Sequence, residues 1–183
     1  IATMSAYVSE RENINNIYPF CKTPLNFIYT TNLKNKLNKK KINSSDILKI
    51  CTNIKSIWEP SARVTRGGYQ TIDNLFEKKE KEIHFLKTII DKEINMYFKK
   101  FNKSNDFVIK KKPKNYKLRA WFVKLLSQGY QKSHIHPTAW LSGVFYLNVP
   151  KSLKNNQGCL KLAQYGYDYP RKIGMKNFIF KPK

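Results

Sequence analysis

The spacing of hydrophobic residues changes along the chain. Over residues 74–101, apolar side chains recur every three or four positions opposite Lys and Glu, which predicts one long amphipathic helix. A shorter helix is expected from residues 44–46, Ser-Ser-Asp, because such residues cap helix N-termini and an apolar side follows them. His84 lies within the long helix, where we interpret a single histidine as structural.

Strand-like patterns follow the basic segment 110–115, in which Pro113 disfavours a continuing helix. Short apolar or alternating runs then predict strands at 118–126, 139–149, 158–162 and 177–180. Helices first and strands afterwards favour a mainly β fold with flanking helices, of the α+β class, over alternating βα units.

Composition favours one folded domain. A chain of 183 residues that is 41% hydrophobic and 14% aromatic can bury a real core. No apolar run approaches the roughly 20 residues of a membrane span, so no membrane partner is expected. Three cysteines, Cys21, Cys51 and Cys159, are odd in number and far apart, which favours reduced thiols and a cytoplasmic location.

The charge of the chain is strongly unbalanced. Lys and Arg number 35 against 12 Asp and Glu, which leaves a net charge of +23. Such a field attracts polyanions in general. The excess is mostly Lys interleaved with Asn and Ile, as in residues 35–43, and no nucleic-acid-binding signature accompanies it. We therefore interpret the lysines as solvated surface, with nucleic-acid binding as the alternative.

Residues 134–137, His-Ile-His-Pro, hold two of the three histidines. Side chains at i and i+2 of an extended backbone point to the same side, so His134 and His136 can converge on one metal ion. Imidazole suits iron, zinc, copper and nickel, and the spacing does not choose among them. The alternative is that one histidine caps the turn at Pro137 and the other is a surface residue.

Two other metal-binding folds also carry His-x-His on a strand. Cupins need a glutamate after three or four intervening residues, where this chain has Trp140 and Leu141. Carbonic anhydrases bind zinc on such a strand, but nothing else in the chain resembles them. Both are weaker alternatives.

An ordered set of short motifs runs through the chain: 58–61 (WEPS), 65–71 (TRGGYQT), 129–131 (GYQ), 134–137 (HIHP) and 140–147 (WLSGVFYL). In this order they resemble the 2-oxoglutarate/Fe(II)-dependent oxygenases, and in particular the branch often carried behind tetratricopeptide repeats. The resemblance covers most of the chain from about Trp58 onward, with fainter similarity at residues 6–8.

The resemblance implies a double-stranded β-helix (jelly-roll) core over residues 57–183, incomplete at the C-terminus. Residues 1–56 would be a helical segment that packs on the barrel or ends a repeat region. His134 would be the first iron ligand and His136 the second, at a position where most such enzymes carry a carboxylate. The third ligand, a distal histidine, and the basic residue that binds 2-oxoglutarate would lie beyond residue 183. We therefore expect a piece of a longer reading frame, inactive by itself.

Two further residues are candidates for binding 2-oxoglutarate. By resemblance to prolyl-hydroxylase-like enzymes, Tyr146 would bind its distal carboxylate, with a core tyrosine as the alternative. Arg66 can bind a carboxylate at the barrel mouth or, alternatively, organise its turn. Ser142 and Gly143 are interpreted as tight packing beneath the metal.

The function implied by the resemblance is that of a dioxygenase, an oxidoreductase that uses Fe(II) and the cosubstrate 2-oxoglutarate. It would couple conversion of 2-oxoglutarate to succinate with hydroxylation of a C–H bond. The substrate, a protein side chain or a small molecule, is not identified by the sequence. The alternative is a basic binding module or pseudo-enzyme on the same barrel, with nucleic acid or protein as its partner.

Overall fold

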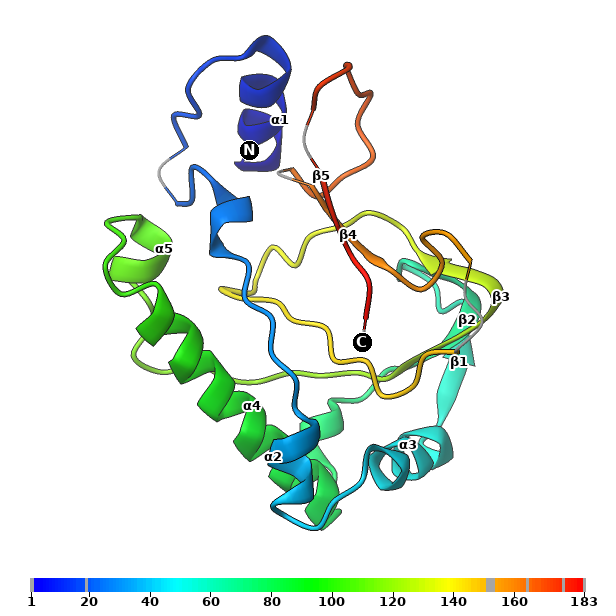
Figure 1. The fold of residues 1–183 in the computed structure, drawn as a ribbon. Coiled ribbons are helices and arrows are strands. Elements are labelled where there is room, and N and C mark those ends of the chain that lie inside the picture. Colours follow the sequence, from blue (N-terminus) through cyan, green and yellow to red (C-terminus); the bar gives the residue numbers. More distant parts are fainter. Residues whose placement is uncertain (1, 19, 151–153, 164, 176, 183) are drawn as a thin grey trace. The chain divides into compact units, whose positions relative to one another are not determined.

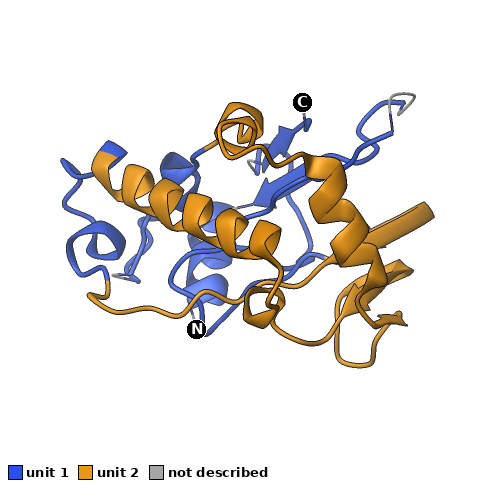
Figure 2. Cartoon of the chain, turned by 90° about the horizontal axis from the view of Figure 1, so that it is seen from below, with its two compact units in different colours: residues 1–29, 100–112, 133–183 blue, residues 30–99, 113–132 orange. Residues whose placement is uncertain are grey.

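The computed structural model describes residues 2–18, 20–150, 154–163, 165–175 and 177–182 (Figure 1). The chain divides into two compact units (Figure 2). Unit 1 comprises residues 1–29, 100–112 and 133–183, and unit 2 comprises residues 30–99 and 113–132. The oxygenase-domain limits, 57–183, remain a prediction.

Unit 2 contains a three-stranded antiparallel sheet in the order β1 (Ser56–Trp58), β2 (Thr65–Thr71) and β3 (Val123–Gln131) (Figure 1). The register of β2 against β3 shifts between Arg66 and Gly68. Gly67 lies there at φ +62°, and a Cβ on Gly68 would lie 2.5 Å from the Lys124 carbonyl oxygen. The two glycines thus allow a bulge and a close approach of strands that bulkier residues would prevent.

The helices of unit 2 are α2 (Lys34–Asn38), α3 (Ser44–Asn53), the 3₁₀ turn η2 (Leu75–Glu77) and α4 (Lys81–Lys100), which runs to the unit boundary. Helix α3 confirms the prediction, although its N-cap is Asn43, whose backbone N–H donates to the Asp46 carboxylate at 3.2 Å. The most deeply buried apolar side chains are Ile47 and Ile83, each 0% exposed.

The long helix starts later than its hydrophobic pattern predicted. Residues 75–77 form the separate turn η2, because the Asn74 side chain accepts hydrogen bonds from the backbone N–H of Phe76 at 3.3 Å and of Ala120 at 3.0 Å. An asparagine that binds backbone in this way competes with helix formation, so α4 begins only at Lys81.

Unit 1 contains α1 (Ala2–Glu12), η1 (Pro24–Phe27), α5 (Phe107–Lys110) and the antiparallel pair β4 (Leu160–Ala163) and β5 (Asn177–Phe180). The strand predicted at 177–180 is confirmed, and that predicted at 158–162 is shifted by about two residues. A buried cluster joins α1 to the segment before β5: Ala6, Tyr7, Tyr165 and Met175.

Two other strand predictions need correction. Residues 118–122 are not in a strand, and the strand that follows them, β3, extends to Gln131. Residues 139–149, predicted to be a strand, have no strand in the structure. The indole of Trp140 holds this segment instead, donating to the Val108 carbonyl at 2.9 Å and packing edge-on against Phe20, with ring centroids 5.0 Å apart. Side-chain packing can thus hold an apolar segment in place even where no neighbouring strand pairs with it.

Helices with two small antiparallel sheets agree with the predicted α+β class. These two sheets do not establish the predicted jelly-roll core. Within the described ranges, no helix is long and apolar enough to cross a membrane.

Candidate functional site

The segment that carries the histidine pair follows β3 and is fixed by local contacts within unit 1. The Ala139 backbone N–H donates to the His136 carbonyl at 2.9 Å, which turns the chain just after the pair. Between the histidines, Ile135 faces Gly166, where an added Cβ would lie 2.4 Å from Ile135 Cγ2. Gly166 has φ +68°, a conformation that favours glycine.

The two imidazoles converge, as their spacing predicted. The Nε2 atoms of His134 and His136 lie 3.2 Å apart, with ring centroids separated by 5.0 Å. Both side chains are half-buried. Their role as metal ligands remains a prediction.

The surroundings of the His136 imidazole favour its neutral form. Burial, and then the neighbouring His134, lowers the pKa of its imidazole below the ordinary value. At neutral pH the ring is therefore uncharged, the form in which a nitrogen lone pair can bind a metal. The Nδ1 atom of the same ring lies 2.7 Å from Ser142 Oγ, within hydrogen-bond distance.

The geometry of the pair fits one transition-metal ion. For an ion about 2.0–2.2 Å from each of the two Nε2 atoms, which lie 3.2 Å apart, the N–metal–N angle would be roughly 95–105°. This angle suits adjacent positions of an octahedral or tetrahedral ion. In the part of the chain that the structure describes, no group of three or more His, Cys, Asp or Glu residues could hold a metal. The pair thus supplies two ligands.

The cysteines do not add to this donor set. Burial raises the pKa of the Cys21 and Cys51 thiols to about 11, with Asp106 and Glu80 as the respective secondary causes. Both therefore stay protonated at neutral pH, whereas the thiolate is the form that binds metals. All three cysteines are free.

Tyr146 also belongs to unit 1, but it is not a core residue, since it is 37% exposed. Partial burial, and then Cys159, raises the pKa of its phenol, so the hydroxyl stays protonated at neutral pH. Its role in binding 2-oxoglutarate remains a prediction.

Arg66 lies in β2 of unit 2, where its guanidinium binds backbone. Its Nη1 atom donates to the carbonyls of Arg63 at 2.9 Å and Thr65 at 2.7 Å. These bonds agree with the turn-organising alternative. They do not test the predicted contact with a carboxylate.

The interpretation of Ser142 and Gly143 as tight packing was wrong. Ser142 is exposed, and a Cβ on Gly143 would meet no atom within 4 Å. The contact of Ser142 with His136 was missed because nothing in the sequence joins a serine to a histidine six residues earlier. Only the turn after His136 brings them together.

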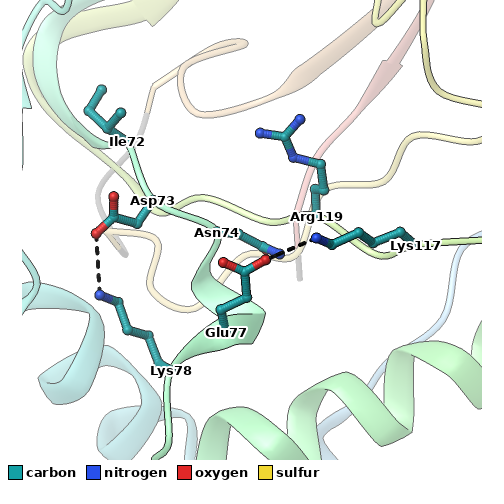
Figure 3. A pocket seen from close by; sticks show the side chains of 7 residues that line it. All are labelled: Ile72, Asp73, Asn74, Glu77, Lys78, Lys117 and Arg119. Carbon is teal, nitrogen blue, oxygen red and sulfur yellow. Dashed lines mark hydrogen bonds and ion pairs between the residues drawn. The ribbon is translucent and has the colours of Figure 1, made fainter.

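Unit 2 contains a surface cavity of about 440 Å³ (Figure 3). Its charged lining is largely paired internally: Lys78 with Asp73 at 3.4 Å and Lys117 with Glu77 at 3.1 Å. Asn74, and then Lys117, lowers the pKa of Glu77. The complete lining is Ile72, Asp73, Asn74, Glu77, Lys78, Lys117 and Arg119. None of these residues was predicted to form a functional site, and such exposed pairs contribute little to stability.

Comparison with known proteins identifies one related family. Residues 119–179 match the family model described as "Putative 2OG-Fe(II) oxygenase". This match covers about a third of the chain and includes His134, His136, Ser142 and Tyr146, whereas Arg66 lies outside it. Searches of curated proteins and of solved structures gave no match.

Proposed function

We propose that the protein is a dioxygenase that hydroxylates its substrate, because residues 119–179 of this chain match the model of the putative 2OG-Fe(II) oxygenase family. The observation that carries this proposal is the 3.2 Å approach of His134 Nε2 to His136 Nε2 inside the matched segment. The family implies Fe(II) as cofactor and 2-oxoglutarate as cosubstrate. The fit of the pair to one metal ion supports the same assignment.

In this proposal His134 and His136 supply two of the ligands that hold Fe(II). When bound, Fe(II) would chelate 2-oxoglutarate and activate O₂, which couples formation of succinate to hydroxylation. Two neutral imidazoles leave the site more positive than one imidazole and one carboxylate would. Such a site favours the dianionic cosubstrate.

The residues of this chain would bind the metal and orient the cosubstrate. The half-buried histidines would hold the metal through their Nε2 atoms, and the metal would supply the binding of the cosubstrate and O₂. We propose that the Tyr146 hydroxyl, protonated at neutral pH, donates to the distal carboxylate of 2-oxoglutarate. The double-stranded β-helix would supply the walls that exclude water.

The substrate of the proposed dioxygenase, a protein side chain or a small molecule, is not identified. A cytoplasmic location is expected for the protein.

Replacing Tyr146 with phenylalanine tests the proposed cosubstrate contact. If one neutral hydrogen bond is lost, Tyr146→Phe should weaken 2-oxoglutarate binding by roughly 0.5–1.5 kcal/mol, measured by calorimetry on the metal-loaded full-length protein. Tyr167→Phe is the matched control, because Tyr167 is similarly exposed at 39% and lies in the same matched segment. Equal dissociation constants for both variants would remove Tyr146 from the site.

The function itself is tested with the wild-type full-length gene product. Loaded with Fe(II) under reducing conditions, it should convert 2-oxoglutarate to succinate slowly even without substrate, faster than free iron does. The alternative, a basic binding module, rests on the net charge of +23. No turnover above free iron, together with nucleic-acid binding that weakens steeply with salt, would favour that alternative.

A further inference from the structure

The side chain of Ser142 is placed to orient the ring of His136, one of the two candidate metal ligands. Its Oγ atom is 2.7 Å from Nδ1 of His136, at the short end of the range for an N–H···O hydrogen bond. The opposite nitrogen of the same ring, Nε2, faces His134. One imidazole thus connects a hydroxyl on one side with the candidate metal position on the other.

The position of Ser142 is fixed by its neighbours although the residue is exposed. The turn closed by the Ala139 N–H and the His136 carbonyl brings the chain back past the histidine. Trp140, two residues before the serine, is anchored by its bond to Val108 and by its edge-on contact with Phe20. The serine therefore approaches His136 from a segment with its own anchor.

A neutral imidazole carries a single N–H, so the two nitrogens have opposite roles. If Ser142 Oγ accepts from Nδ1–H, the lone pair is on Nε2, directed at the metal position. If the serine hydroxyl donates to Nδ1 instead, Nε2 carries the proton and cannot bind a metal. Outer partners that accept from the second nitrogen of a metal-bound histidine orient the ring and make it a better ligand.

We propose that Ser142 is a positioning residue: its hydroxyl accepts the Nδ1–H of His136 and holds the ring with Nε2 toward the metal shared with His134. This inference rests on the proposed function, because it assigns the second contact of a proposed ligand. It requires no charge change of either histidine.

The test measures Zn(II) binding to the full-length protein by NMR, from the ring signals of His134 and His136. Zinc is diamagnetic and suits imidazole. Ser142→Ala should weaken binding by about 10-fold, the low end for outer partners, because water can partly replace an exposed hydroxyl. It should also abolish the hydrogen-bonded Nδ1–H signal that we expect for His136 in the wild type. Ser142→Thr, which keeps the hydroxyl, should restore both.

Ser133→Ala is the matched control, since Ser133 is an exposed serine next to His134 with no role in the site. It should bind zinc like the wild type. Equal affinity of Ser142→Ala and the wild type, with an unchanged Nδ1–H signal, would overturn the positioning role alone. If the wild type shows no zinc-dependent change at either histidine, the metal site and hence the proposed function fail instead.

Discussion

His134→Ala is expected to abolish metal binding at the histidine pair and to reduce succinate release to the level of free iron. The variant removes one of two nitrogens that lie 3.2 Å apart, and the described residues offer no third donor group to replace it. Loss of a direct ligand should exceed the 10–100-fold typical of outer partners, so affinity should fall by more than about 100-fold. NMR titration with Zn(II) and a succinate assay on the full-length protein measure the two effects.

His84→Ala is the matched control, because His84 is an exposed histidine of α4 in unit 2. It should bind metal and release succinate as the wild type does. His136→Ala should impair both measurements less completely, since position 136 is the one at which this chain departs from the common ligand set. If His134→Ala retains wild-type affinity, the metal lies elsewhere and the assignment of the pair is wrong.

Gly166→Ala is expected to destabilise unit 1 and to weaken metal binding together. The new Cβ would lie 2.4 Å from Ile135 Cγ2, and an alanine at φ +68° is itself strained. Cγ2 is attached directly to Cβ of Ile135, so this stiff side chain can relieve the clash only by rotating χ1 or by a shift of its backbone. That backbone joins the two histidines, so the shift would reach the candidate site. Strain of roughly 1–2 kcal/mol and overpacking of roughly 1–3 kcal/mol together predict a loss of about 2–5 kcal/mol in the free energy of unfolding.

Two other glycines separate these contributions in denaturant unfolding experiments. Gly174 has φ +92° but open space around its Cβ position, so Gly174→Ala should show the backbone strain alone and leave metal affinity unchanged. Gly143 also has open space and is not among the glycines with positive φ, so Gly143→Ala should have little effect on stability. If Gly166→Ala unfolds like Gly174→Ala and binds metal normally, the contact with Ile135 does not support the site.

The sequence by itself determined what depends on local periodicity and short-range geometry. Helix α3, most of α4 and strand β5 follow from apolar spacing and capping residues that lie within a few positions of one another. The convergence of His134 and His136 was predicted in the same way, because a separation of two residues is a local relation, although the pair lies after β3 and not in a strand. The family motifs are equally local, and the match over residues 119–179 includes those at 129–131, 134–137 and 140–147.

The tertiary structure decided what depends on partners distant in the sequence. Residues 139–149 carry a strand-like pattern, yet Trp140 packs against Phe20 and binds Val108, and a strand requires a neighbour that no local pattern supplies. The contact of Gly166 with Ile135 joins residues far apart in the chain, and Ser142 reaches His136 only through an intervening turn. Close approaches of this kind arise from packing, and so the supports of the candidate site were visible only in three dimensions.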